Sequence, residues 1–219
     1  MEEKIIEEIE IEAKKYFEDA MPTHDWSHIE RCKKLSERIG KTENVDMSVI
    51  KLAVLLHDTG RRLEDETSGK IPHEKEGERI ARKILEEYNL ENSIIEKVCY
   101  CIRMHRFRGN NSMPETIEAR VLYDTDKLDA IGAIGIARSY SFSGENHQKL
   151  YSEYGRDGNI DSIGSGYESE HNPVKEFLGK LIKVKDKMLT KEGKKIAEER
   201  HKFMIEFFDR LNKEIEGEL

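Results

Sequence analysis

The chain has 219 residues, of which 37% are charged and only 7% are aromatic, and its formal net charge is -8. Lys and Glu are interleaved, so no broad basic surface exists to grip a nucleic-acid polymer, although a small anionic partner remains compatible with this charge. The longest apolar run, residues 52–56, is far too short to cross a bilayer, and the acidic start is unlike a signal peptide, which predicts a cytoplasmic protein without a membrane partner.

The first part of the chain carries apolar residues at helical rather than alternating spacing, which predicts an all-α fold. An amphipathic helix is expected over residues 5–17. A second helix is expected to begin at Ser27, because Ser27 and Glu30 have the capping-box spacing in which each side chain satisfies a free backbone N–H. Residues 48–57 are apolar on nearly every side and therefore predict a helix at the centre of the fold.

The middle of the chain continues this helical pattern after a polar stretch at residues 61–72, which is interpreted as a loop. One apolar stripe then begins at His73 and the next ends at His105, so each of these two predicted helices carries a histidine at one end. A long helix is expected over residues 115–139, with acidic residues on its apolar stripe.

The last third of the chain differs in composition. Residues 141–172 are rich in glycine, tyrosine and serine and lack periodicity, which indicates a loop or lid. Two amphipathic helices, at residues 173–189 and 190–216, are expected to close the fold. No linker divides the chain before the glycine-rich stretch, so we predict a single compact helical bundle over residues 1–219, with its core at residues 20–140.

Three cysteines, Cys32, Cys99 and Cys101, lie in predicted helices. Their number is odd, and their spacing is that of neither a zinc ribbon nor a disulfide scaffold. They are therefore interpreted as reduced thiols in the core.

Four potential metal ligands fall at inward-facing positions of three predicted helices: His28, the adjacent pair His57 and Asp58, and Asp126. Burying such groups without a partner costs roughly 1–3 kcal/mol or more each. A divalent cation is a suitable shared partner, because carboxylates neutralise its charge and neutral imidazole nitrogens donate lone pairs to it. The pattern predicts a divalent metal site, and these ligand types suit Mn, Fe, Mg, Ni or Zn.

The sequence around these ligands is distinctive. It reads HDWSHIERC around His28, AVLLHDTG at the end of the central helix, and EARVLYDTDKLDAIGAIGIARSYSFSG around Asp126. Together with the order of the ligands, these segments resemble the H…HD…D signature of the HD-domain metal-dependent phosphohydrolase superfamily. The closing NPVKEFLGKLIKVKDKMLTKEGKKIAEERHKFM resembles one bacterial and archaeal branch of small, single-domain HD hydrolases, so the resemblance covers nearly the whole chain.

The resemblance implies an all-α fold in which the four residues named above hold one metal ion, with a second ion possible. It implies hydrolysis of phosphate ester or anhydride bonds and, for members near this branch, nucleoside triphosphate pyrophosphohydrolysis. Many relatives have an acidic residue three positions after the HD aspartate, where this chain has Arg61. Glu64, Asp65 or Glu66 could take the general-base role from the same segment, and Glu64 is the candidate we name.

Further candidates surround the predicted site. Some HD proteins hold a second metal with two histidines placed between HD and the last Asp, and His73 and His105 have that order. With one metal bound, they would contact substrate phosphate or relay a proton. Asp129 shares a face with Asp126 and would orient a ligand, contact substrate or form a structural ion pair. Four cations are candidates for binding substrate phosphate: Arg61, Arg62, Lys127 and Arg138.

The predicted function is a metal-dependent phosphohydrolase that uses water as its nucleophile on a nucleotide or another small phosphorylated metabolite. A homo-oligomer is compatible with this function. Two alternatives remain open. One is a di-iron oxygenase, because a minority of HD proteins use two metals for oxidation, and the other is a non-catalytic module that senses nucleotides.

Overall fold

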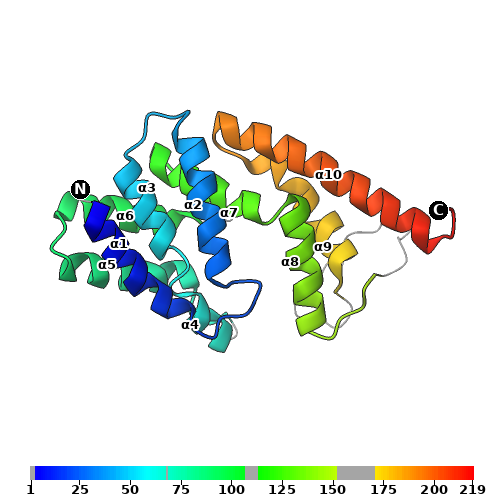
Figure 1. Cartoon of the computed structure of the whole chain (residues 1–219), viewed down its shortest axis with the longest axis horizontal. Coiled ribbons are helices and arrows are strands. Elements are labelled where there is room, and N and C mark those ends of the chain that lie inside the picture. The colour runs from blue at the N-terminus through cyan, green and yellow to red at the C-terminus, as the bar shows by residue number, and fades with distance from the viewer. Residues whose placement is uncertain (1–2, 68, 107–112, 152–170) are drawn as a thin grey trace. The chain divides into compact units, whose positions relative to one another are not determined.

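The computed structural model describes residues 3–67, 69–106, 113–151 and 171–219. Within these residues the chain is helical and contains no strand, so the predicted all-α fold is confirmed (Figure 1). No helix in the described part of the chain is both long enough and apolar enough to cross a membrane. The chain divides into two compact units, residues 1–126 and 127–219, which are described separately below.

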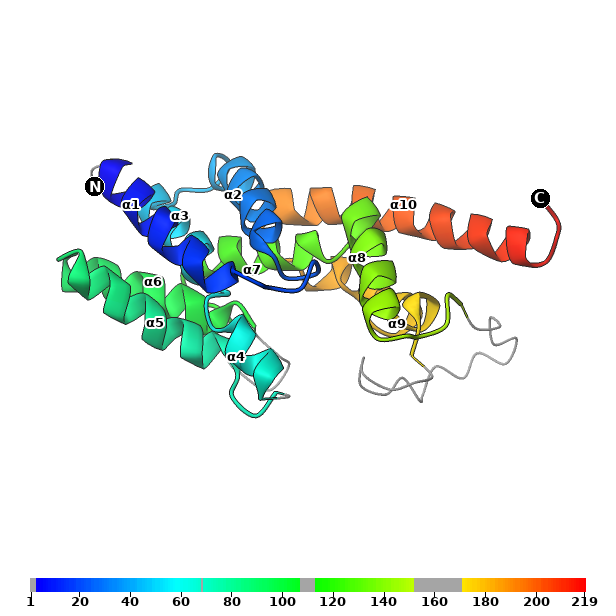
Figure 2. The same ribbon diagram turned by 60° about the horizontal axis from the view of Figure 1, so that its bottom comes forward.

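The first unit is built around helix α3 (Met47–Leu56), which contacts α1, α2, α5 and α6. Its apolar side chains from Val49 to Leu56 are buried, so the predicted central helix is confirmed. Figure 2 shows α5 and α6 side by side in this unit. Besides α3, the elements of the first unit ahead of α7 are α1 (Glu3–Lys14), η1 (Lys15–Phe17), α2 (Trp26–Gly40), α4 (Arg61–Glu66), α5 (His73–Glu87) and α6 (Asn92–Met104).

Helix α2 is capped two residues earlier than the capping-box spacing predicts. Its N-cap is Asp25, whose carboxylate accepts a hydrogen bond from the backbone N–H of Ser27 at 3.0 Å. The prediction of a cap at Ser27 is wrong, because Asp25 supplies the stronger, charged acceptor two residues ahead. His28 nevertheless lies in the first turn of the helix, as expected.

The polar stretch after the central helix is not simply a loop, because residues Arg61–Glu66 form helix α4. Ion pairs at helical spacing support it: Arg61 Nε lies 3.5 Å from an oxygen of Asp65, and Arg62 Nε lies 2.8 Å from an oxygen of Glu66. Oppositely charged pairs at i and i+4 stabilise a helix whose sequence is otherwise polar. The expected loop is therefore confined to residues that follow α4.

The single long helix expected over residues 115–139 is wrong. The structure has α7 (Ile117–Asp129) and α8 (Gly132–Glu145), separated by Ala130 and Ile131. Ile131 is extended, with φ -129° and ψ 168°, and Gly132 has φ +77°, a conformation that an α-helix does not contain. Glycine reaches this region without the steric cost that a Cβ imposes, which permits the break here.

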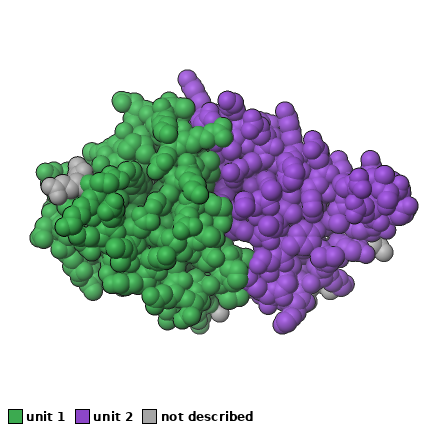
Figure 3. All heavy atoms as spheres, viewed as in Figure 1, with its two compact units in different colours: residues 1–126 green, residues 127–219 purple. Residues whose placement is uncertain are grey.

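The second unit comprises the end of α7, α8, α9 (Pro173–Gly179), η2 (Leu181–Lys183), η3 (Lys185–Lys187) and α10 (Lys191–Ile215), and Figure 3 colours it apart from the first. Helix α8 packs against α9 and α10. The last predicted helix is confirmed as α10, which Thr190 caps. The helix predicted at residues 173–189 is wrong beyond Gly179, because Lys180 leaves the helical region with φ -129° and ψ -55° and two short 3-10 turns follow.

The glycine-rich stretch begins later than predicted, because residues 141–145 complete α8. Within the chain, residues 152–170 of the expected loop or lid lie outside the described residues. The single domain expected over residues 1–219 stays a prediction.

All three cysteines are buried and none of them forms a disulfide, which confirms the interpretation of reduced core thiols. Burial raises the pKa of the Cys99 thiol to about 11 and that of Cys101 to about 12. Both side chains are therefore neutral thiols at physiological pH.

Candidate metal centre

Four imidazoles and two carboxylates, from α2, α5, α7 and the ends of α3 and α6 in the first unit, form one cluster with Asp58 at its centre. His28 stands in the first turn of α2, His57 is the C-cap of α3, His73 is the first residue of α5, and His105 is the C-cap of α6. The sixth is Asp126 of α7. The four histidines and Asp58 are buried, with at most 7% of each residue exposed, whereas the Asp126 side chain is 20% exposed.

One oxygen of Asp58 faces the first group of ligands. His28 Nε2 lies 3.2 Å from His57 Nε2, 3.7 Å from Asp58 Oδ2 and 3.8 Å from Asp126 Oδ1. His57 Nε2 lies 3.9 Å from Asp58 Oδ2. Ligands that each sit about 2.1 Å from one ion are separated by roughly 3.0–4.2 Å, so these four residues fit one coordination sphere.

The other oxygen of Asp58 faces a second group. His73 Nε2 lies 3.4 Å and His105 Nε2 lies 3.7 Å from Asp58 Oδ1, and the two imidazole nitrogens are 3.0 Å apart. Asp58, His73 and His105 thus form a cluster that could hold a metal ion by itself. The Asp58 carboxylate stands between the two groups and is shared by them.

The hydrogen bonds of the rings show which nitrogens carry lone pairs. The Nδ1 atoms of His57 and His105 lie 2.8 Å and 2.5 Å from the carbonyl oxygens of Val54 and Ile102, which can only accept. Each Nδ1 therefore donates, and in the neutral ring Nε2 carries the lone pair.

The same holds for His73, whose Nδ1 donates to the carboxylate of Glu64 at 2.8 Å. The lone pairs of His73 and His105 thus meet at 3.0 Å with no donor between them. A cation makes such an approach favourable, so the donor set fits a divalent metal ion.

Burial controls the charge of the His57 ring. It lowers the pKa of His57 from 6.5 to about 4, against the opposing attraction of Asp58, so His57 is neutral at physiological pH. Burial alone would raise the pKa of Asp58, but the surrounding histidines hold that pKa well below its usual range. An ionised carboxylate beside a neutral imidazole is the charge state in which Asp58 and His57 bind a divalent cation.

Glu64 and Arg106 hold His73 in place. The Glu64 carboxylate accepts from the backbone N–H of His73 at 2.7 Å, from His73 Nδ1 at 2.8 Å and from Arg106 Nη1 at 2.5 Å. Arg106 also pairs with Glu74 at 3.3 Å. Although burial opposes its ionisation, these hydrogen bonds hold the pKa of Glu64 far below its ordinary value. Glu64 is thus an ionised acceptor directed at His73.

Two glycines let α5 approach the turn after α3 closely. A Cβ on Gly60 would lie 2.5 Å from the carbonyl oxygen of His73 and 2.6 Å from the backbone nitrogen of Gly77. A Cβ on Gly77 would lie 2.9 Å from the carbonyl oxygen of His57. Backbone atoms cannot move aside as a flexible side chain can, so both positions require glycine and bring His73 next to Asp58.

The predicted substrate-binding cations have different surroundings. Arg61 Nη1 lies 3.3 Å from His73 Nδ1, which places Arg61 beside the second group. Arg62 pairs with Glu66 at the surface. Lys127 and Arg138 belong to the second unit, where Arg138 Nη1 donates to the buried carboxylate of Asp129 at 2.9 Å. The structure thus shows the ion pair that was one of the alternatives for Asp129.

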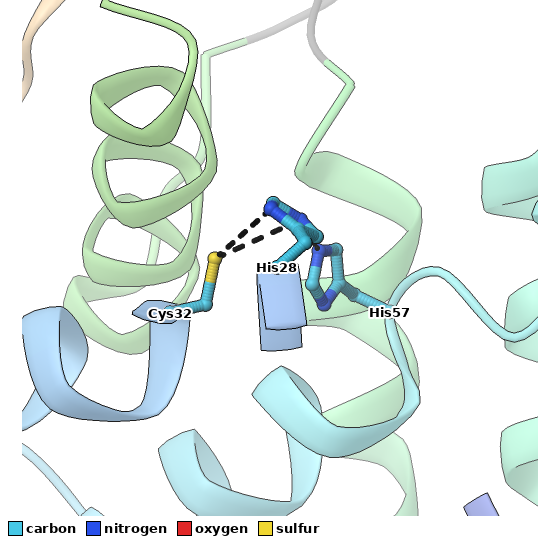
Figure 4. A group of neighbouring side chains, drawn as sticks. All are labelled: His28, Cys32 and His57. Atoms are coloured by element: carbon cyan, nitrogen blue, oxygen red, sulfur yellow. Dashed lines mark hydrogen bonds between the residues drawn. The ribbon is translucent and has the colours of Figure 1, made fainter. Parts of the chain in front are cut away.

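Sequence reasoning passed over two residues beside the candidate ligands. Cys32 lies one helical turn after His28, and its sulfur is 3.7 Å from both ring nitrogens of His28 (Figure 4). Arg106 directly follows His105 and bonds to Glu64. The i, i+4 spacing from His28 could have indicated Cys32, whereas the Arg106 contact joins residues 42 positions apart and had no local signal.

Comparison with known proteins identifies relatives of this chain. Residues 25–131 match the HD domain family. The protein YpgQ of Bacillus subtilis strain 168, itself uncharacterized, is 31% identical over 210 residues, which cover 91% of this chain and 88% of that protein.

Two solved structures resemble the whole chain. That of B. subtilis YpgQ in complex with ADP is 28% identical, with a TM-score of 0.73, and the match covers 96% of this chain and 97% of that one. An HD-superfamily hydrolase from Bacillus thuringiensis is also 28% identical, with a TM-score of 0.73, and the match covers 98% of both chains.

Proposed function

The chain belongs to the HD domain family, and from that premise we propose that it is a metal-dependent phosphohydrolase acting on a nucleotide. The observation that carries this proposal is the position of Asp58, whose two oxygens face histidine nitrogens on either side at 3.4–3.9 Å. His28, His57, Asp58 and Asp126 would hold the ion.

A divalent ion held by these residues would supply Lewis-acid polarisation of a phosphoryl oxygen and a water of lowered pKa. The protein contributes a fixed set of ligands whose ring orientations are set by backbone carbonyls and by Glu64. Fixed ligands need no rearrangement when substrate binds, which is how an active site stabilises developing charge at low cost.

His73 and His105 are proposed to act on the substrate side of the same centre. Their Nε2 atoms face Asp58 Oδ1, and in the imidazolium form they would donate hydrogen bonds to phosphate oxygens or move a proton. Glu64 is proposed to position His73 rather than to act as the general base, because its carboxylate already accepts three hydrogen bonds.

Arg61 is the cation best placed to bind a phosphate, since it lies beside His73 and is only 20% exposed. Arg62 could add a second positive charge from the surface of α4. For Lys127 and Arg138 a role in phosphate binding stays a prediction, based on their proximity in sequence to Asp126. Asp129 is proposed to hold Arg138 near the break between α7 and α8.

The substrate class is proposed from two observations. The similar protein YpgQ has been crystallised with ADP, and the sequence resembles a branch whose members release pyrophosphate from nucleoside triphosphates. We therefore expect hydrolysis of a nucleoside triphosphate to a monophosphate and pyrophosphate. In that reaction a water oxygen bonds to the innermost phosphorus and gives up a proton to His73, to His105 or to solvent, and pyrophosphate leaves with the electrons of the broken P–O bond.

The test is a panel of nucleotides and simple phosphate esters, with products identified by ion chromatography. We expect His57→Ala and Asp58→Ala to lose turnover, whereas His201→Ala serves as a matched control because His201 lies on α10 of the second unit. Pyrophosphate as product supports the proposed bond, and inorganic phosphate alone contradicts it. Undiminished hydrolysis by Asp58→Ala contradicts the whole assignment.

The second ligand group favours one other candidate, an oxygenase that uses two iron ions. Asp58, His73 and His105 lie within reach of a second ion, and a bridging carboxylate suits a pair of metals. Oxygen uptake together with two iron ions per chain would favour this candidate. One ion per chain, or hydrolysis without oxygen uptake, would exclude it.

A further inference from the structure

A pocket of about 320 Å³ in the first unit has Asp58 as part of its wall. Its other walls come from two short segments, the residues after α1 and helix α4. The lining residues are Tyr16, Phe17, Asp19, Ala20, Met21, His24, Asp58, Arg61, Arg62, Asp65 and Glu66. Small-molecule sites occupy about 300–1,000 Å³, so this volume suits a ligand of modest size. Because Asp58 belongs to the candidate metal centre, the pocket adjoins it directly.

The segment after α1 gives the pocket a partly apolar wall. Phe17 is held by an edge-to-face contact with Trp26, with ring centroids 5.3 Å apart. Met21 is 48% exposed, which leaves it available for contact with a ligand. Between them, Asp19 has φ +61°, a conformation that few residues other than glycine adopt. An aromatic residue and a flexible methionine are the side chains that pack well against a planar ring.

The charges of the pocket decide which part of a nucleotide fits it. Apart from Asp58, which belongs to the candidate metal centre, three carboxylates line it, those of Asp19, Asp65 and Glu66, against two guanidinium groups. A polyphosphate placed inside would face this excess of negative charge, whereas an uncharged base and ribose would not. Carboxylates also accept hydrogen bonds from ribose hydroxyls and from the amino groups of bases.

Arg61 marks the boundary between the pocket and the metal centre. It lines the pocket, and its Nη1 lies 3.3 Å from His73 Nδ1. Its nearest carboxylate oxygens are 3.5 Å and 4.0 Å away, on Asp65 and Glu64, and its buried Nε has no hydrogen-bond partner among the described residues. Arg106, by contrast, is held by Glu64 at 2.5 Å. Arg61 is thus the less tightly bound of the two cations and can turn toward a phosphate.

We propose that this pocket is the nucleoside subsite, in which the base packs against Phe17 and Met21, the ribose meets the carboxylates, and Arg61 binds the phosphate chain where it leaves for the metal centre. This inference rests on the proposed function and makes its substrate class specific. Since the pocket wall includes Asp58, the phosphate attached to the ribose is the one nearest the metal centre, in keeping with release of pyrophosphate.

The test fills the pocket with Met21→Trp and compares the affinities of ADP and inorganic pyrophosphate, which lacks the nucleoside. Both are measured by titration calorimetry on the full-length protein with its metal. Ile11→Trp is the matched control, because Ile11 is 66% exposed and does not line the pocket. We expect wild type to bind ADP about tenfold or more tightly than pyrophosphate. Met21→Trp should remove that difference in affinity and leave pyrophosphate binding unchanged. Ile11→Trp should bind both ligands as the wild type does.

Equal affinity of wild type for ADP and pyrophosphate overturns the proposal. An equal loss of affinity for ADP and for pyrophosphate in Met21→Trp also overturns it, and so does normal binding of ADP by Met21→Trp. Unchanged pyrophosphate binding shows that the variant is folded. If ADP binding depends on Met21 while no nucleotide or ester is hydrolysed, the subsite stands and the proposed hydrolase fails. If nucleotides are hydrolysed and Met21→Trp binds ADP normally, the proposed hydrolase stands and the proposed subsite fails.

Discussion

Replacement of Glu64 by Gln separates a positioning role from a general-base role at this residue. Gln keeps the size of the side chain and an oxygen that can accept hydrogen bonds, but it loses the charge. In the native structure the Glu64 carboxylate accepts hydrogen bonds from His73 Nδ1 at 2.8 Å, from the backbone N–H of His73 at 2.7 Å and from Arg106 at 2.5 Å. In the variant the ring of His73 keeps only a neutral acceptor for Nδ1, so its tautomer and the direction of Nε2 toward Asp58 are fixed less strongly.

The size of the effect follows from the ring hydrogen bond. A hydrogen bond to a charged group contributes about 1.5–3 kcal/mol and a neutral one about 1 kcal/mol, so the variant loses roughly 0.5–2 kcal/mol at this contact. Replacing residues that orient a metal-binding histidine typically costs about 10–100-fold in affinity or activity. We expect kcat to fall within that range while the KM for nucleotide changes little, because Glu64 contacts His73 rather than the pocket.

The assay is the pH profile of kcat/KM, with Glu74→Gln as a matched control. Glu74 is the second residue of α5, and its carboxylate accepts a hydrogen bond from Arg106 at 3.3 Å. A positioning role predicts a lower rate with the acidic limb of the profile kept, and less than about threefold change in the control. Loss of the acidic limb in Glu64→Gln would refute the positioning role, and an unchanged rate would refute any role.

Three other predictions concern stability. In chelator-treated protein, His57 takes up a proton between pH 4 and 6.5 only when unfolded, because its pKa falls from 6.5 to about 4 on folding. The free energy of unfolding should therefore rise with pH across this window, by up to about 3 kcal/mol, and urea titrations of wild type and His57→Gln that give equal pH slopes would contradict this. Gly60→Ala should cost about 1–3 kcal/mol through its backbone clashes, whereas Gly144→Ala, where a Cβ meets nothing within 4 Å, should cost none by thermal melting. Arg138→Gln should destabilise the protein by about 1.5–3 kcal/mol if Arg138 serves Asp129, and a raised KM with unchanged stability would instead assign Arg138 to the substrate.

The sequence could predict those parts of the fold whose physics is local. Residues 48–57 are apolar all round and form the central helix, and the histidines at helix ends meet because each heads or ends a buried stripe. The four proposed metal ligands lie close together, with His28 on α2, Asp126 on α7, and the pair His57 and Asp58 directly after α3.

The parts that sequence reasoning missed depend on contacts or backbone conformations that no periodicity records. The break before Gly132 needs a positive φ at a glycine that also fits a helical pattern. Helix α4 is stabilised by ion pairs within a segment too polar to show an apolar stripe. The hydrogen bond from Arg106 to Glu64 joins α4 to the residues just after α6, so it cannot be predicted without knowing how these two helices pack.

The metal content of the purified protein tests the central claim most directly. Elemental analysis of wild type and Asp58→Ala, each also assayed after dialysis against a chelator, should show at least one divalent ion per wild-type chain and none retained by Asp58→Ala. Turnover should vanish with the ion and return when it is added back to wild type. Full hydrolytic activity in protein from which all metal has been removed would contradict the account.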